Sequence, residues 1–97
     1  MTAPIQASKA WWLYLVRTAR GSLYAGITTD IERRFSEHQS GGRLAARALR
    51  GKGPLALAYS HPAGTHSEAL KKEYRLKRWS KAQKEALICG ARTFEEI

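Results

Sequence analysis

Residues 12–38 read WLYLVRTARGSLYAGITTDIERRFSEH, and this stretch decides the fold. Residues 11–16 are all aromatic, leucine or valine, and no turn former occurs in residues 11–17, which predicts a strand there. Residues 18–21 predict a turn, and residues 22–27 a second, antiparallel strand. A hairpin loop with an odd number of residues, in which Gly21 supplies a positive φ, places residues of equal parity on one face. We therefore expect Tyr14 and Tyr24 to point to the same side of the sheet.

A helix is predicted after the second strand. Thr29 and Glu32 have the spacing of a capping box, and the glycines after residue 40 are typical of a helix end. Arg34 and His38 are four residues apart, so they share one face of this helix. Two phenols, a guanidinium and an imidazole beside a turn that contains glycine form an arrangement suited to binding phosphate.

The rest of the chain predicts one more strand and further helices. Residues 43–50 favour a short basic helix, residues 55–60 a third strand, and residues 61–64 a loop. Two more capping boxes, Thr65 with Glu68 and Ser80 with Gln83, predict helices to about residues 79 and 89. The order β-β-α-(α)-β-α-α gives an α+β fold, a small three-stranded antiparallel sheet flanked by helices. We expect a disordered lead-in at residues 1–10, a single domain at residues 11–90 and a short C-terminal tail at residues 91–97.

Length and composition restrict the class of protein. Ninety-seven residues permit one domain with one modest core. The single cysteine, Cys89, rules out an intramolecular disulfide and is expected to be a small buried side chain. No apolar run approaches the ~18 residues of a membrane span, and the N-terminus lacks the pattern of a secretory signal. A cytoplasmic protein without a membrane partner is expected.

The net charge of +9 is concentrated in two segments. Residues 71–84 hold seven cations against one acid. Residues 43–52 hold no acid, and their cations are Arg43, Arg47, Arg50 and Lys52. One basic run often only solvates a helix face, but two dense runs with this overall excess indicate a polyanionic partner, with nucleic acid the leading candidate.

Glu73 is the most informative residue outside residues 12–38. Ala69, Leu70 and Leu76 mark the buried stripe of the helix at residues 65–79, and Glu73 falls within it. A carboxylate in that position is costly unless it is paired or binds a cation. Two interpretations stay open, an ion pair with Arg34 or Lys77, and a ligand for a divalent metal ion.

These residues resemble the GIY-YIG nuclease superfamily over residues 11–89. Trp12-Leu13-Tyr14 stands where the family has G-I-Y, and Tyr24-Ala25-Gly26 stands where it has Y-I-G. The helix that contains Glu73 resembles the helix that carries the family's metal-binding glutamate. The similarity is greatest to the small single-domain bacterial (YhbQ-type) branch.

The resemblance implies a metal-dependent endonuclease that hydrolyses DNA phosphodiester bonds. Its catalytic residues would be Tyr14, Tyr24, Arg34, His38 and Glu73. Glu73 would hold Mg²⁺ or Mn²⁺, Tyr24 would be the general base and Tyr14 would orient water or phosphate; His38, which titrates near neutrality, is the alternative base. Low sequence specificity or structure selectivity, and a role in DNA repair or recombination, would follow from the resemblance.

Contacts to the nucleic-acid backbone are expected from cations outside the catalytic set. These are Arg33, Arg43, Arg47, Arg50, Lys52 and Lys77. The partner would be DNA, with RNA possible, and the protein a monomer or weak homodimer.

The sequence departs from the family pattern in two respects. Trp12 replaces the glycine of G-I-Y, and the chain has no asparagine to fill a position that some members occupy late in the domain. The alternative function is a non-catalytic basic module that binds DNA or RNA with the same fold.

Overall fold

The structure is a computed structural model that describes residues 10–97, and its architecture is α+β, as predicted. Residues 1–9, which fall in the predicted lead-in, lie outside the described part of the chain. The elements in chain order are β1 (Trp11–Arg17), β2 (Leu23–Thr28), α1 (Ile31–Ser40), the 3-10 turn η2 (Arg47–Leu49), β3 (Ala56–Gly64), α2 (His66–Lys77), α3 (Lys81–Cys89) and the 3-10 turn η3 (Phe94–Glu96).

The sheet is three-stranded and antiparallel, in the order β2-β1-β3. β1 is the central strand, which agrees with its apolar residues on both faces. Tyr14 pairs with Gly26 and Val16 with Tyr24 across the hairpin. Five residues separate the paired Arg17 and Leu23, and Gly21 has a φ of 92°. The loop length is therefore odd, and Tyr14 and Tyr24 lie on the same face as predicted.

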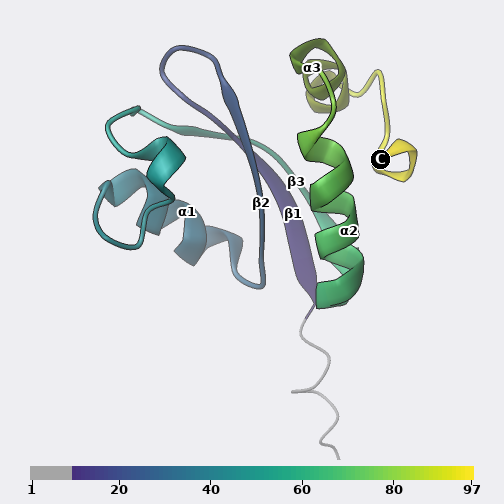
Figure 1. Cartoon of the computed structure of the whole chain (residues 1–97), viewed down its shortest axis with the longest axis horizontal. Coiled ribbons are helices and arrows are strands. Elements are labelled where there is room, and N and C mark those ends of the chain that lie inside the picture. Colours follow the sequence, from purple (N-terminus) through teal and green to yellow (C-terminus); the bar gives the residue numbers. More distant parts are fainter. Residues whose placement is uncertain (1–9) are drawn as a thin grey trace, which may run out of the picture.

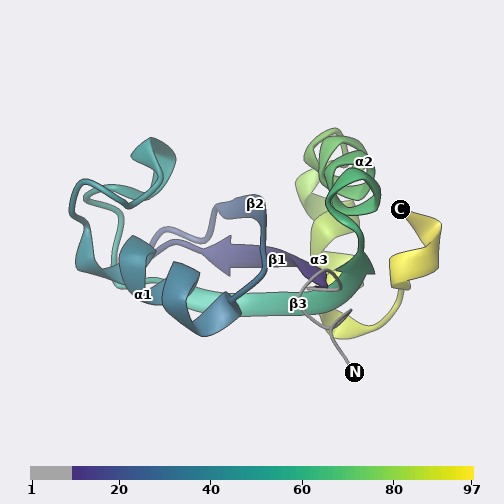
Figure 2. The same ribbon diagram turned by 90° about the horizontal axis from the view of Figure 1, so that it is seen from below.

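Helices cover both faces of the sheet, so the molecule has two small cores (Figure 1). In Figures 1 and 2, α1 lies on one side of the strands and α2 on the other. Leu13 and Leu15 of β1 pack with Ala69 and Leu76 of α2. Val16 packs on the opposite face in the second core, whose buried residues are Tyr14, Val16, Leu49 and Leu55. The two tyrosines of the hairpin face α1 and residues 41–55.

The cap of α1 differs from the prediction. Asp30 is the N-cap, with its carboxylate accepting a hydrogen bond from the Arg33 N–H at 3.0 Å. The predicted box of Thr29 with Glu32 is therefore wrong. Thr28 accepts a hydrogen bond from the Asp30 N–H through Oγ1 at 3.1 Å, which delays the helix by one residue. The other two capping boxes, at Thr65 and Ser80, are confirmed.

Two segments between the helices also differ from the prediction. Only a three-residue 3-10 turn, η2, forms within the predicted basic helix at residues 43–50. β3 extends to Gly64, through the predicted loop. The strand tolerates Pro62, which has no N–H, because β3 lies at the edge of the sheet and its register shifts beside Trp11 and Trp12.

Two side chains predicted to be buried are exposed. Cys89, the last residue of α3, faces solvent, and Leu70 of α2 is 43% exposed. Leu70 lies one helix position beyond the buried Ala69, and the expectation for Cys89 rests only on the usual burial of free cysteines. Ile97, in contrast, is only 8% exposed and packs in the core between the sheet and α2, so residues beyond α3 pack on the domain.

Candidate active site

Tyr14 is the centre of the site. Its side chain is 3% exposed, and its hydroxyl lies 2.9 Å from Nε2 of His38. The ring lies against Gly26 of the neighbouring strand, where an added Cβ would be 2.5 Å from the Tyr14 oxygen. Gly26 is therefore required by the position of the phenol, because any larger residue would displace it.

His38 is buried and held from both sides. It is 1% exposed, and its Nδ1 accepts a hydrogen bond from the Ala46 N–H at 3.2 Å. A backbone N–H can only donate, so Nδ1 carries no proton and Nε2–H is the donor to Tyr14. Burial, reinforced by the nearby Arg34 cation, lowers the pKa of His38 and so favours this neutral form.

The same contacts explain the titration of Tyr14. Burial, joined by the neighbouring Tyr24, raises the pKa of Tyr14 from 10.0 to about 12, although the Arg34 guanidinium opposes the rise. Tyr14 is thus a neutral phenol at physiological pH. Because the Tyr14 oxygen accepts a hydrogen bond from Nε2–H of His38, its own hydroxyl hydrogen is free for another partner.

Arg34 is oriented by Glu37 and by the Leu44 carbonyl, neither of which was predicted to belong to the site. Its Nη1 donates to Oε1 of Glu37 at 2.8 Å and to the Leu44 carbonyl at 2.6 Å. Arg33 donates to the other oxygen of Glu37 at 2.7 Å. The hydrogen bond from Arg34, with a further contribution from Arg33, lowers the pKa of Glu37. The signal for Glu37 was present in the sequence, since it lies three and four residues after the two arginines.

Tyr24 completes the group on this face. It is half-buried against the second core, with its ring centroid 5.7 Å from that of His38 in an edge-to-face arrangement. Four of the five predicted catalytic residues, Tyr14, Tyr24, Arg34 and His38, therefore lie together.

Glu73 approaches the group from α2, on the other side of the sheet. No hydrogen bond within residues 10–97 joins its carboxylate to the other four residues. It is nevertheless close enough for its charge to add to the rise in the pKa of Tyr14, as the smallest of the causes. Its side chain is 17% exposed and lies 3.4 Å from Nζ of Lys77. The structure thus forms the Lys77 ion pair that the sequence left open, and not the Arg34 pair.

The surroundings of Glu73 suit a loosely held divalent cation. Within residues 10–97 no cluster of three or more histidine, cysteine or acidic side chains could hold a metal ion by itself. Glu73 is a sheltered carboxylate whose one ionic contact is longer than a hydrogen bond. Mg²⁺ is often bound through one or two carboxylates, with water and substrate phosphate completing its shell. One available carboxylate fits that requirement, and Glu73 is the residue that provides it.

The predicted nucleic-acid contacts divide into two groups. Arg33 and Lys77 are each paired with an acid, Glu37 and Glu73 respectively. The others are exposed on residues 41–55, namely Arg43, Arg47, Arg50 and Lys52. This segment is held to α1 by the Ala46–His38 and Leu44–Arg34 hydrogen bonds, so the basic surface and the site form one unit. Within the described residues no helix has the length and apolar character needed to cross a membrane.

Comparison with known proteins gives one consistent result. Residues 10–86 match the family model described as the GIY-YIG catalytic domain. A UPF0213 protein of Enterobacter sp. (strain 638) is 59% identical over 87 residues, which is 90% of this chain and 83% of the relative. The UPF0213 protein YhbQ of Escherichia coli O127:H6 is 55% identical over 90% of this chain and 85% of the relative.

Two solved structures are similar to this fold over most of the chain. The solution NMR structure of a UPF0213 protein from Bacillus halodurans has a TM-score of 0.52 and 35% identity over 82% of this chain and 83% of that one. The solution NMR structure of an E. faecalis protein has a TM-score of 0.58 and 34% identity over 84% of this chain and 85% of that one.

Proposed function

The chain belongs to the GIY-YIG catalytic domain family, a nuclease superfamily, and on that premise we propose that it is a metal-dependent endonuclease that hydrolyses DNA phosphodiester bonds. One observation carries the proposal beyond family membership. The hydrogen-bonded series Ala46 N–H, His38, Tyr14 is complete, and Arg34 lies beside it in a fixed orientation. A preorganised neutral donor next to a guanidinium is what a phosphate ester undergoing hydrolysis requires.

The protonation states divide the roles between the aromatic residues. Tyr14, with its pKa near 12, is a donor and a poor base. His38 is also a poor base, because Nδ1 accepts from Ala46 and Nε2 carries the donated proton. This reasoning supports Tyr24 as the group that takes the proton of the attacking water. Tyr24 would pass its own phenolic proton to a phosphate oxygen or to solvent, so the proton count balances.

Arg34 has hydrogen-bonding capacity left for substrate. Its hydrogen bonds to Glu37 and Leu44 use Nη1, and an interaction with the Tyr14 side chain uses a further donor, so two of the five N–H donors of the guanidinium remain for a phosphate oxygen. A guanidinium offers two parallel donors to a phosphate, which lysine cannot do. Arg34 would stabilise the charge that develops on the scissile phosphate, while His38 holds Tyr14 in position to donate to the same phosphate or to the water.

Glu73 would hold the metal ion, Mg²⁺ or Mn²⁺. When bound, such an ion neutralises charge on the phosphate and helps to orient the substrate. Lys77 would have to release the carboxylate, which a 3.4 Å contact to a half-exposed lysine allows at little cost. The lysine would then be free to contact the nucleic-acid backbone.

The substrate is proposed to be DNA cut with low sequence specificity or selected by structure, in repair or recombination. The exposed cations on residues 41–55 support backbone contacts, which do not depend on sequence. RNA offers the same backbone phosphates, so RNA belongs among the substrates tested.

The test is to incubate the purified protein with labelled duplex, single-stranded and branched DNA and a matched RNA. Each would be run with Mg²⁺, with Mn²⁺ or with EDTA. We expect cleavage with a divalent ion and none with EDTA, and the preferred substrate indicates the process served. Tight, salt-sensitive binding without cleavage of any substrate would instead favour the non-catalytic basic module.

A further inference from the structure

A cavity of about 330 Å³ lies at the tip of the hairpin, beyond the site described above. The β1–β2 turn forms one wall and the residues between Leu49 and Leu55 form the other. Its lining residues are Thr18, Ala19, Arg20, Ser22, Gly51, Lys52 and Gly53.

The lining of the cavity is positively charged, because it contains two cations and two hydroxyls but no acid. Within residues 10–97 neither Arg20 nor Lys52 has an acidic partner within 4.0 Å, whereas Arg17, Arg33 and Arg34 are each paired with a glutamate. Thr18 and Ser22 share a hydrogen bond of 2.7 Å between their hydroxyls, so one hydroxyl hydrogen remains available. Two adjacent unneutralised cations repel each other, and an anion between them would relieve that repulsion.

The cavity is fixed by hydrogen bonds of the backbone. The Ala19 N–H donates to the Lys52 carbonyl at 3.0 Å, which ties residues 51–53 to the turn. The Thr18 N–H donates to the Ser22 carbonyl at 2.9 Å, and Thr18 is 6% exposed. Gly51 and Gly53 line the wall without a side chain, so a ligand can approach the main chain there. The walls are therefore formed before any ligand binds.

The cavity opens on the same face as the catalytic group. Thr18 continues the parity of Tyr14 and Val16, and Ser22 that of Tyr24. Thr18 is four residues from Tyr14 along the strand, about 13 Å at the usual rise of a strand. At about 3.4 Å of axial rise per nucleotide of duplex, this distance corresponds to about four nucleotides, and to fewer in an extended strand.

We propose that this cavity binds a second backbone phosphate of the substrate strand, up to about four nucleotides from the scissile bond, between Arg20 and Lys52. The inference rests on the proposed function, since it assigns the register of the same substrate. Its consequence is that the enzyme requires a minimum length of strand on one side of the cut. The ligand chemistry is a phosphate oxyanion, so free inorganic phosphate is the competing occupant.

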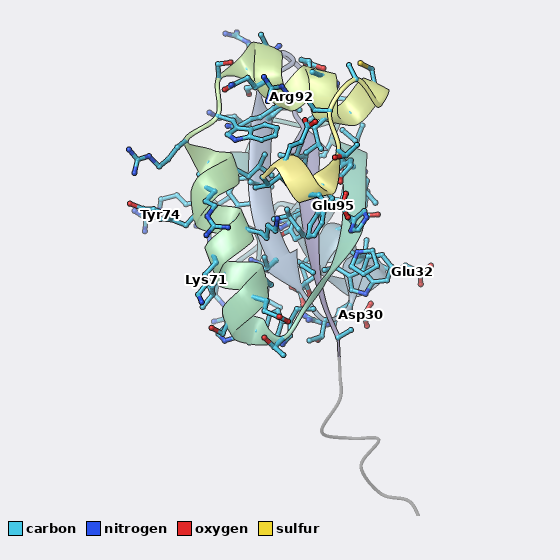
Figure 3. All side chains as sticks on the ribbon, turned by 90° about the vertical axis from the view of Figure 1, so that its right-hand side faces the viewer. Asp30, Glu32, Lys71, Tyr74, Arg92 and Glu95 are labelled. Carbon is cyan, nitrogen blue, oxygen red and sulfur yellow. The ribbon has the colours of Figure 1, made fainter. Side chains whose placement is uncertain are left out.

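The test uses oligonucleotides with one mapped cleavage position. Each carries a single uncharged methylphosphonate, placed in turn at every phosphate within six positions of the cut. Single-turnover cleavage would be measured for wild type, for Lys52→Ala and Arg20→Ala, and for Lys71→Ala. Lys71 is an exposed cation on the outer side of α2 (Figure 3), so it is a control matched in charge.

We expect one methylphosphonate position beyond the scissile phosphate to slow wild type and Lys71→Ala about tenfold, the usual effect of losing one charge-assisted hydrogen bond. In Lys52→Ala and Arg20→Ala that same substitution should have little further effect. Equal sensitivity in all four proteins, or no sensitive position, would overturn the inference while leaving cleavage intact.

A titration without catalysis separates the two proposals. Isotopically labelled Glu73→Gln protein would receive a short oligonucleotide or inorganic phosphate, at constant ionic strength, while amide NMR signals are followed. Shifts of Gly51 and Gly53 with the oligonucleotide support the inference even if wild type cuts nothing. Equal shifts with inorganic phosphate at the same concentration would assign the cavity to free phosphate, and no shift with either ligand would overturn the assignment.

Discussion

Tyr14→Phe tests the hydrogen-bonded centre of the site most sharply. The change removes the hydroxyl 2.9 Å from Nε2 of His38 and leaves the ring in place. The Nε2–H of a histidine that is 1% exposed then has no acceptor. Leaving a buried donor unsatisfied costs about 1–3 kcal/mol, so the melting temperature should fall by at least 4 °C, at about 4–8 °C per kcal/mol for a domain of this size.

Denaturant unfolding and DNA cleavage would both be measured, with Tyr59→Phe as the matched control. Tyr59 is half-buried in β3, and its hydroxyl makes no hydrogen bond within residues 10–97. Tyr59→Phe should therefore leave stability nearly unchanged. Tyr14→Phe should also lower the cleavage rate at saturating substrate, because the donor to the phosphate is lost.

The stability of the protein at alkaline pH gives a second, independent test of the role of Tyr14. A pKa raised to about 12 from 10.0 means that the folded state keeps the phenol neutral where the unfolded chain ionises it. That part of the stability is present below pH 10 and is lost as the pH rises toward 12, by about 1.4 kcal/mol for each pKa unit. The advantage of wild type over Tyr14→Phe should therefore shrink above pH 10. A constant difference from pH 8 to 11.5, or equal stability of the two proteins at pH 8, would refute the reasoning.

Three further changes test other parts of the site. Gly26→Ala should destabilise the protein by about 1–3 kcal/mol in denaturant unfolding, because its Cβ would lie 2.5 Å from the Tyr14 hydroxyl oxygen. Gly42→Ala should not, because the nearest atom to its added Cβ would be 3.6 Å away. Equal effects of the two changes would contradict the packing argument. Glu37→Gln should lower the cleavage rate at saturating substrate more than it raises KM, because Arg34 loses the charge that orients it. An unchanged cleavage rate would show that the Leu44 carbonyl alone is sufficient to orient Arg34. The lowered pKa of His38 predicts that the free energy of unfolding declines as the pH falls from about 7 to 5, because the unfolded chain takes up a proton that the folded site resists. His38→Gln should lose this pH dependence and His66→Gln should keep it. A pH dependence unaffected by His38→Gln would assign it to other groups.

Local chemistry in the sequence was sufficient to predict most of the fold. The parity of the hairpin loop was enough to place Tyr14 and Tyr24 on one face, and the apolar residues on both faces of β1 were enough to place it at the centre of the sheet. The error at Thr29 arose because Asp30 is an equally good cap, and the Thr28 side chain selected it. β3 was underestimated because Pro62 usually ends a strand, and only the position of that strand at the sheet edge permits it.

The site was harder to predict where it depends on contacts far apart in the chain. Arg34 and His38 could be paired from helical spacing, and so could Glu37 had it been considered. The backbone groups of Leu44 and Ala46 that hold them could not, because those residues carry no side-chain signal. For the same reason the choice between Tyr24 and His38 as the base stayed open in the sequence. It depends on which histidine nitrogen the Ala46 N–H occupies.

The central claim is that this chain hydrolyses nucleic acid with a metal ion held by Glu73. The most direct measurement is single-turnover cleavage of labelled DNA by wild type and Glu73→Gln in Mn²⁺ and Mg²⁺, with binding of the same DNA measured in EDTA. We predict that Glu73→Gln loses cleavage while its binding is kept or strengthened, because one negative charge is removed beside the phosphate. Cleavage retained by the folded variant, or a variant that binds no DNA and is unfolded, would contradict the assignment and leave Glu73 as the ion-pair partner of Lys77 alone.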